Sequence, residues 1–359
     1  MKKKVYLTLQ NGDVYQGYRF GADGEATGEL VFSTGMVGYM ETLTDPSYFG
    51  QIVVQTFPMI GNYGVMPQDA ESGKVQVSAY VVREVCEQPS NFRCEGTLDN
   101  YLKEQGVVGI YGVDTRQLTK VLRENGVMNA RISDKPLSEA EFAQMVNYEI
   151  KNAVATVAEN KKGYFEAENA VATVALWNFG AKNSTIANLN AQGFNVINMP
   201  AFSTAEEILA TGADGVVLSD GAGNPEENTG IIEEIKKVVG KVPVFGLGLG
   251  HLLLALAFGA KTKKQKYGHR GGNQPVKRLE SGRVYISSQN HGFEVVLDSI
   301  KEGTVSFVNV NDGSCEGIDY DMNDAFTVQF TPEACALGEQ ENPLYKKFFM
   351  LMKKEYKNA

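Results

Sequence analysis

The sequence is poor in the residues that hold metals and form disulfide frameworks. Its 359 residues include three histidines, one tryptophan and four cysteines. The cysteines are Cys86, Cys94, Cys315 and Cys335, and no two of them form a CxxC pair or a spacing typical of a zinc site. We therefore expect reduced thiols, as in a cytoplasmic protein, and no bound metal.

The sequence also lacks long apolar runs and an excess of positive charge. No run approaches the roughly 20 apolar residues of a membrane-spanning helix, and the N-terminal MKKKVYLTLQ has no apolar core of a signal peptide. The formal net charge is −9 and the isoelectric point is about 5.1. Such a charge argues against nucleic acid or an anionic membrane as a partner. We expect a soluble cytoplasmic protein that binds neither.

The apolar content is sufficient for two ordinary domains. Hydrophobic residues make up 43% of the chain and charged residues 21%. The first half begins with a hairpin that turns at the Asn-Gly pair of residues 11–12, and it contains amphipathic helices at 98–107 and 115–127. We predict a mixed β/α domain over residues 1–150 and a linker over residues 151–170.

The pattern changes at Val171 to an alternation of strands and helices. Apolar strands at 171–179, 195–200, 215–219 and 242–246 alternate with helices at 183–193, 204–212, 228–240 and 252–259. The alternation predicts a second domain over residues 171–359 that contains a parallel, doubly wound sheet. Ligands of such sheets bind beyond the carboxyl ends of the strands.

The stretch 242–260, VPVFGLGLGHLLLALAFGA, runs from a buried strand through a glycine-rich turn into a buried helix. This arrangement places one residue on a sharp elbow above a parallel sheet. Glycines are needed there because the backbone is strained and neighbouring segments approach closely. The residue at the elbow is Gly248, which has no side chain. The turn is not a dinucleotide loop, because His251 and Leu253 stand where GxGxxG requires glycine.

Other polar positions have two interpretations each. The loop SDGAGNP at 219–225 follows a strand, and its backbone N–H groups either hold an oxyanion or only form a tight turn. We expect His251 to be a structural residue in a buried helix start. We expect His291 to lie on a loop between strands and to hydrogen-bond locally. Thr331 precedes a Pro-Glu pair after a strand, where it supplies no base for that glutamate to orient.

These motifs resemble, from end to end, the small subunit of carbamoyl phosphate synthase. The C-terminal half is similar to the class I glutamine amidotransferases in its elbow at 246–252, its glycine loop at 219–225, QNHGF at 289–293 and Pro-Glu-Ala at 332–334. The N-terminal half is similar to the domain that distinguishes the small subunits, through the segments at 28–53, 58–64, 90–93 and 113–126, and YGHRGGNQPV at 267–276 resembles a further signature. The resemblance implies an α/β protein: a mixed β/α small-subunit domain followed by a flavodoxin-like amidotransferase domain.

The resemblance also implies where the site lies. In that family a cysteine at the elbow attacks the glutamine side chain, a histidine acts as base, a glutamate orients it, and backbone N–H groups of the elbow and the glycine loop hold the oxyanion. In this sequence the nucleophile falls on Gly248, the base on Thr331, the orienting acid on Glu333 and a substrate-contacting glutamine on Leu252. The other glutamine-contacting positions are retained: Ser47, Gly221, Gly223, Leu249, Asn290, Gly292 and Phe293.

The resemblance implies a heterodimer with a large subunit, which uses ATP to make carbamoyl phosphate for arginine and pyrimidine synthesis, and it implies no cofactor in this chain. Without nucleophile and base, we expect a pseudoenzyme that binds glutamine weakly if at all and serves as scaffold or regulator of an ammonia-using large subunit. Two alternatives remain open. In the first alternative, the chain hydrolyses glutamine through other residues, such as Cys335. In the second, it binds another small ligand in the altered pocket.

Overall fold

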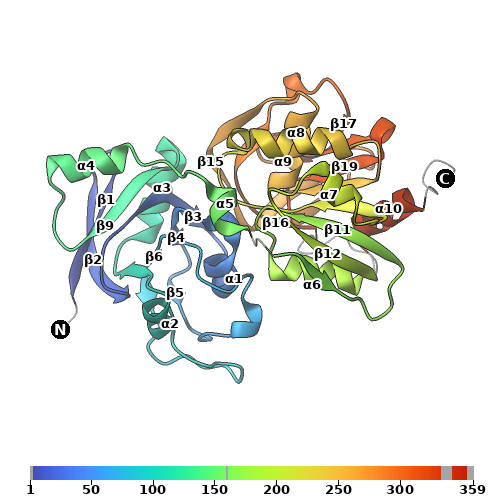
Figure 1. Ribbon diagram of the computed structural model, residues 1–359. Helices are drawn as coiled ribbons and strands as arrows, with labels where there is room; N and C mark the ends of the chain where they lie inside the picture. The colour runs from blue at the N-terminus through green and yellow to red at the C-terminus, as the bar shows by residue number, and fades with distance from the viewer. Residues whose placement is uncertain (1–2, 159–160, 333–341, 354–359) are drawn as a thin grey trace. The chain divides into compact units, whose positions relative to one another are not determined.

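The computed structural model describes residues 3–158, 161–332 and 342–353 (Figure 1). The chain divides into two compact units, one of Met1–Lys151 with Lys266–Gly271 and one of Asn152–Gln265 with Gly272–Ala359. Among the described residues, no helix has both the length and the apolar character needed to cross a membrane.

Seven described strands of the first unit close into a barrel. Their order is β1 (Lys4–Leu9), β2 (Val14–Gly21), β8 (Val108–Tyr111), β6 (Ala79–Val82), β4 (Gln51–Gln55), β3 (Ala26–Ser33) and β9 (Met128–Ser133). The predicted hairpin is confirmed: β1 and β2 pair antiparallel, and Gly12 in the turn has a φ of 92°. Alternate residues of β1, among them Val5 and Leu7, are fully buried in an apolar cluster with Ile52 and Ile110.

Short helices and a small sheet complete the first unit. They are α1 (Tyr39–Thr44), α2 (Leu98–Glu104), α3 (Thr115–Asn125), α4 (Glu139–Val146), and the two-stranded sheet of β5 (Met59–Ile60) and β7 (Glu84–Val85). Both predicted helices of this half are present, as α2 and α3. Helix α3 begins where its sequence indicates, because the Asp114 side chain accepts a hydrogen bond from the Gln117 N–H, and it ends at Gly126.

Residues 151–170, expected to form a linker, instead contain two elements of the second unit. Helix α5 (Ala153–Val157) buries Ala153, Val154 and Val157. Strand β10 (Gly163–Phe165) pairs antiparallel with β12. The polar residues near 161–163 suggested an exposed connection, but the apolar residues before them pack into the core of the second unit.

The second unit has the predicted parallel sheet with helices on both faces. The parallel strands are β12 (Phe194–Pro200), β11 (Ala172–Asn178), β13 (Gly215–Leu218), β14 (Val244–Leu247) and β19 (Ala325–Val328), in that spatial order. Helices α7 (Ala205–Leu209), α8 (Thr229–Val238) and α9 (Leu249–Ala257) pack on one face, and α6 (Asn183–Ala191) and α10 (Pro343–Met352) on the other (Figure 1).

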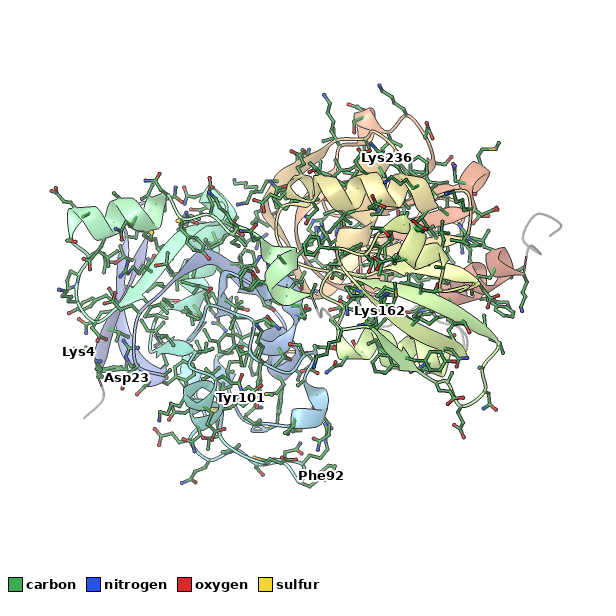
Figure 2. All side chains as sticks on the ribbon, in the orientation of Figure 1. Lys4, Asp23, Phe92, Tyr101, Lys162 and Lys236 are labelled. Carbon is green, nitrogen blue, oxygen red and sulfur yellow. The ribbon has the colours of Figure 1, made fainter. Side chains whose placement is uncertain are left out.

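Helix α8 shows why the helices pack against the sheet with one particular face. Its residues Ile231, Ile232 and Ile235 are buried. Lys236, labelled in Figure 2, is exposed, as is Lys237, and both form ion pairs with acidic residues of the same helix. The helix thus has one apolar stripe against the sheet and one charged face.

Antiparallel strands extend the sheet beyond β19. They follow in the order β18 (Cys315–Tyr320), β17 (Thr304–Asn309), β15 (Thr262–Arg278) and β16 (Val284–Val295). The sequence patterns at 283–297 and 304–310 predict β16 and β17, but β15 and β18 were not predicted. The residues of β15 are polar and glycine-rich and lack an apolar alternation. His291 lies within β16 and not on a loop, so that part of its prediction is wrong.

Candidate active site

The predicted elbow is present at the junction of β14 and α9. Gly248 connects the two elements with φ 50° and ψ −109°, a conformation that L side chains rarely adopt. Its N–H donates to the Val328 carbonyl oxygen at 3.0 Å. The neighbouring strand β19 therefore holds the elbow at the carboxyl end of the parallel sheet.

The glycines beside Gly248 allow close approach of the backbone. A Cβ on Gly246 would lie 2.7 Å from Cγ2 of Thr327, and a Cβ on Gly250 would lie 2.7 Å from Cβ of Leu218 and still closer to the Leu218 carbonyl oxygen. These separations are shorter than Cβ atoms tolerate. The expectation that tight packing selects glycine in this turn is confirmed.

The space beside Gly248 is filled by the carboxylate of Asp220, a residue that the sequence prediction missed. A Cβ on Gly248 would overlap the carboxylate carbon and Oδ1 of Asp220. Oδ1 accepts the N–H of Gly221 at 2.8 Å and the N–H of Leu249 at 2.9 Å. The structure thus brings together one N–H group from each of the two segments, the glycine loop and the elbow, to which the resemblance assigned oxyanion binding, and both donate to an internal carboxylate.

Both glycines of the loop have packing partners of their own. A Cβ on Gly221 would lie 2.8 Å from Cδ2 of Leu249, and a Cβ on Gly223, where φ is +90°, would lie 2.6 Å from Cβ of Ala153 in α5. The tight-turn interpretation therefore explains Gly223 without any ligand, whereas Gly221 also supplies an N–H to the site. The loop also borders a cavity of about 130 Å³, whose lining includes Ala222 and Asn224.

Thr331, at the base position, interacts with a lysine from the start of α6. The Lys182 ammonium donates to Thr331 Oγ1 at 3.0 Å, and the Thr331 N–H donates to the Ser288 carbonyl oxygen. Lys182 is buried to 8% exposure. A hydroxyl that accepts from an ammonium has no capacity to act as general base near neutral pH. Glu333, at the orienting position, lies outside the described residues.

The leucines of α9 belong to the apolar core. Leu249 and Leu252 are 4% and 3% exposed and join the cluster that also holds Leu218. The Leu252 N–H donates to the Gly248 carbonyl oxygen at 3.3 Å. Leu252 thus continues the helix from the elbow and supplies no polar group to a ligand.

The remaining retained positions lie on β16 and in the first unit. Asn290, Gly292 and Phe293 are half-buried residues of β16. Ser47 belongs to the first unit, where both its N–H and its hydroxyl donate to Oδ1 of Asp45, at 2.9 and 2.6 Å.

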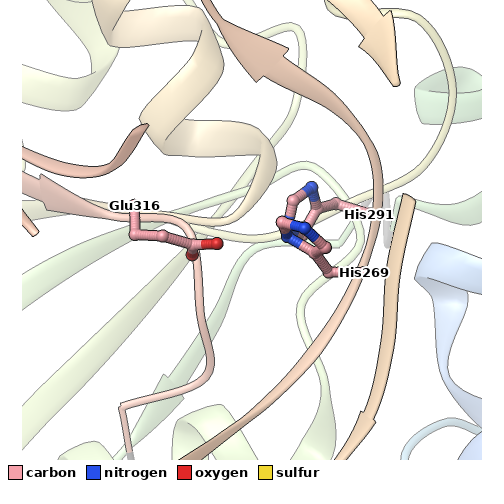
Figure 3. Close-up of side chains that lie close together, drawn as sticks. All are labelled: His269, His291 and Glu316. Atoms are coloured by element: carbon pink, nitrogen blue, oxygen red, sulfur yellow. The ribbon is translucent and has the colours of Figure 1, made fainter. Parts of the chain in front are cut away.

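His291 is held by a chain of hydrogen bonds along the sheet. Its Nδ1 lies 2.9 Å from the Phe293 carbonyl oxygen and its Nε2 lies 2.9 Å from Gln289 Oε1. Gln289 in turn donates to Oε2 of the fully buried Glu316 at 3.0 Å. Figure 3 shows the side chains of His291 and Glu316. His269, also drawn in Figure 3, belongs to the segment Lys266–Gly271 of the first unit. The predicted local hydrogen bonding of His291 is confirmed, with a structural partner on β18.

His251 is buried directly behind the elbow. Its Nδ1 lies 2.8 Å from Thr327 Oγ1, and no side chain or backbone group among the described residues bonds its Nε2. Burial lowers the pKa of His251 from 6.5 to about 3. The imidazole is therefore neutral at physiological pH, which agrees with the predicted structural role.

Replacing His251 by asparagine is expected to flatten the pH dependence of stability in the acid range. The folded pKa is depressed, so the unfolded chain takes up the proton more readily below pH 6.5. The contribution of neutral His251 to the free energy of unfolding is thus fully present above pH 6.5. It falls by about 1.4 kcal/mol per pH unit as the pH drops toward 3. Denaturant titrations of both proteins between about pH 6 and pH 4 measure the difference. Parallel pH profiles would contradict the prediction.

Comparisons with known proteins agree with this architecture. The family model for the carbamoyl-phosphate synthase small chain, CPSase domain, matches residues 7–132, and that for class-I glutamine amidotransferase matches residues 175–351. The chain is 43% identical over 353 residues to the carbamoyl phosphate synthase small chain of Bacillus caldolyticus, covering 98% of this chain and 97% of that one. It is 45% identical over 347 residues to the small chain of Clostridium perfringens, covering 96% and 98%.

A solved structure of a glutamine amidotransferase from Thermotoga maritima is 18% identical, with a TM-score of 0.35, and the match covers 52% of this chain and 84% of that one. The two family models and the relatives that match along almost the whole chain show that the resemblance reflects homology. The chain belongs to the carbamoyl phosphate synthase small chain family and contains that family's class I glutamine amidotransferase domain.

Proposed function

We propose that this chain is a small subunit that does not hydrolyse glutamine and that acts as scaffold or regulator of an ammonia-using large subunit. The observation that carries the proposal is Gly248 at the elbow, in the position of the nucleophile. Hydrolysis through a covalent intermediate requires a side chain that attacks the amide carbon, and glycine has none. The ammonia, in this proposal, reaches the large subunit from solution.

The base position supports the same function. Thr331 has no group that titrates near neutral pH, and its hydroxyl oxygen already accepts from Lys182. In well-studied hydrolases, loss of triad members removes roughly 10³–10⁶-fold of rate. Two absent members leave Glu333 with nothing to orient.

The first unit supports a role in a synthase complex. The synthase-specific family model covers residues 7–132, which lie wholly outside the amidotransferase region. A domain that matches the synthase family model rather than the amidotransferase model, although it also contains Ser47, is suited to binding the large subunit. In this proposal the large subunit supplies ATP chemistry, and the complex makes carbamoyl phosphate for arginine and pyrimidine synthesis.

Co-purification followed by active-site trapping tests the proposal. The chain, co-expressed with the large subunit, is expected to form a stoichiometric complex and to gain no mass after treatment with an electrophilic glutamine analogue. A glutamine-hydrolysing amidotransferase treated in parallel shows that the reagent is active. An adduct that glutamine protects against, on Cys335 or any other residue, would show that hydrolysis continues through other residues. Failure to bind the large subunit would refute the scaffold role.

A further inference from the structure

Two backbone N–H groups from separate elements point at one oxygen of Asp220. Gly221 lies in the loop after β13, and Leu249 is the first residue of α9. Their N–H groups donate to the same Oδ1 at 2.8 and 2.9 Å. Hydrogen bonds from N–H groups to a carboxylate are roughly twice as strong as bonds between neutral groups. The carboxylate therefore fixes the loop and the helix start against each other.

Gly248 provides the room that this carboxylate occupies. A Cβ at Gly248 would overlap Oδ1 and the carboxylate carbon, and it would lie 2.8 Å from Oδ2. The overlap involves the middle of a short side chain that two hydrogen bonds hold in place, so it is not relieved by a small rotation. An L residue at position 248 and the Asp220 carboxylate therefore cannot both occupy these positions.

We propose that the Asp220 carboxylate is a built-in occupant of the oxyanion site and that it excludes substrate carbonyl groups from the elbow. The inference rests on the proposed function and deepens it, because it assigns the closure of the site to a residue outside the triad. A tetrahedral oxyanion and a carboxylate are both anions whose oxygens accept hydrogen bonds from the same N–H donors. A substrate must compete with an anion that is tethered beside the donors, and tethering gives a very high effective concentration.

The inference makes Gly248 and Asp220 a matched pair. Glycine at the elbow supplies no nucleophile and leaves room for the carboxylate. The carboxylate then accepts the hydrogen bonds of the two N–H groups beside the elbow. A cysteine restored at position 248 would therefore compete with Asp220 for this space, and the oxyanion donors are not free while the carboxylate keeps its two hydrogen bonds. Asp220 is a specificity-determining residue in this sense, since its side chain decides which groups reach Gly221 and Leu249.

A double-mutant cycle tests the pairing without any assay of activity. Gly248→Ala alone is expected to raise the unfolding equilibrium constant strongly, through overlap with Asp220 and through the positive φ. In an Asp220→Ala background, the factor by which the same substitution raises the unfolding equilibrium constant is expected to be at least about tenfold smaller, because only the backbone strain remains. Gly230→Ala on α8, where a Cβ has nothing within 4 Å, is the control and should combine additively with Asp220→Ala. Additive effects of Gly248→Ala and Asp220→Ala would overturn the proposal.

Restoration of the triad tests the closure itself. The variant Gly248→Cys/Thr331→His/Leu252→Gln is expected to release ammonia from glutamine at the background rate. Adding Asp220→Ala is expected to raise that rate by about 100-fold or more, the usual contribution of an oxyanion donor. Equal rates with and without Asp220 would show that the carboxylate is not the barrier. Glutamine hydrolysis by the unaltered chain would refute the proposed function instead, and the stability cycle would still decide whether Asp220 and Gly248 are paired.

Discussion

With glutamine as the only nitrogen donor, the complex of this chain with a large subunit is expected to form carbamoyl phosphate at least about 10³-fold more slowly than with ammonium. The resemblance assigns the nucleophile position to Gly248 and the base position to Thr331, whose hydroxyl oxygen accepts a hydrogen bond from Lys182. Under the proposed function, neither attack on the amide nor proton transfer to the leaving group has a side chain at these two positions to perform it. This is the largest effect we expect on activity, because it removes the first reaction altogether.

Steady-state synthesis measured with ammonia-free glutamine and with ammonium chloride checks this expectation. The same glutamine reaction supplemented with an unrelated glutaminase is the control, since ammonia released in solution should restore synthesis. Restoration shows that the complex is intact and that only ammonia is missing. Comparable rates from glutamine and ammonium, without the added enzyme, would show that this chain hydrolyses glutamine.

The elbow could be predicted from sequence because its signals are local. A short apolar run, glycines at every second position and a following apolar helix are contiguous between Val242 and Ala260. The same holds for α3, whose cap residues Asp114 and Gly126 adjoin its apolar stripe. Patterns of this kind need no knowledge of which distant segments pack together.

The barrel and the occupant of the elbow could not be predicted in this way. Barrel closure depends on pairings such as β1 with β9, which join residues from opposite ends of the first unit. Asp220 reaches Gly248 and Leu249 only because β13 and β14 are neighbours in the sheet. A signal was nevertheless present, since an acidic residue directly precedes the loop glycine whose N–H the resemblance assigns to oxyanion binding.

The same limit applies to the base position. Lys182 and Thr331 are 149 residues apart in sequence, and they meet because α6 follows β11 while Thr331 follows β19. The residues around Thr331 predict a lost base at that position, but nothing in them indicates Lys182 as its partner. Burial likewise explains His251, whose chemistry depends on the core around it more than on its neighbours in the chain.

Replacing Gly250 by alanine is expected to destabilise the second unit by about 3 kcal/mol. A Cβ there would lie 2.7 Å from both the carbonyl carbon and Cβ of Leu218, at the end of β13. The Gly250 N–H also donates to the Ser219 carbonyl oxygen at 3.0 Å, which ties the start of α9 to the same strand. The clash must push the helix from the strand and lengthen this bond, because the obstructing atoms are backbone and Cβ rather than a flexible side-chain end.

Gly230→Ala provides the matched control for this prediction. Gly230 is an exposed residue of α8, a Cβ there meets nothing within 4 Å, and its φ lies outside the left-handed region. Alanine at this position is expected to be neutral or to stabilise by about 0.5–1 kcal/mol, through helix propensity and a less flexible unfolded chain. Urea titrations of the two variants separate the effects, since both make the same chemical change within a helix. If both alanines had equal effects, the close approach of β13 to α9 would not be what requires glycine at the elbow.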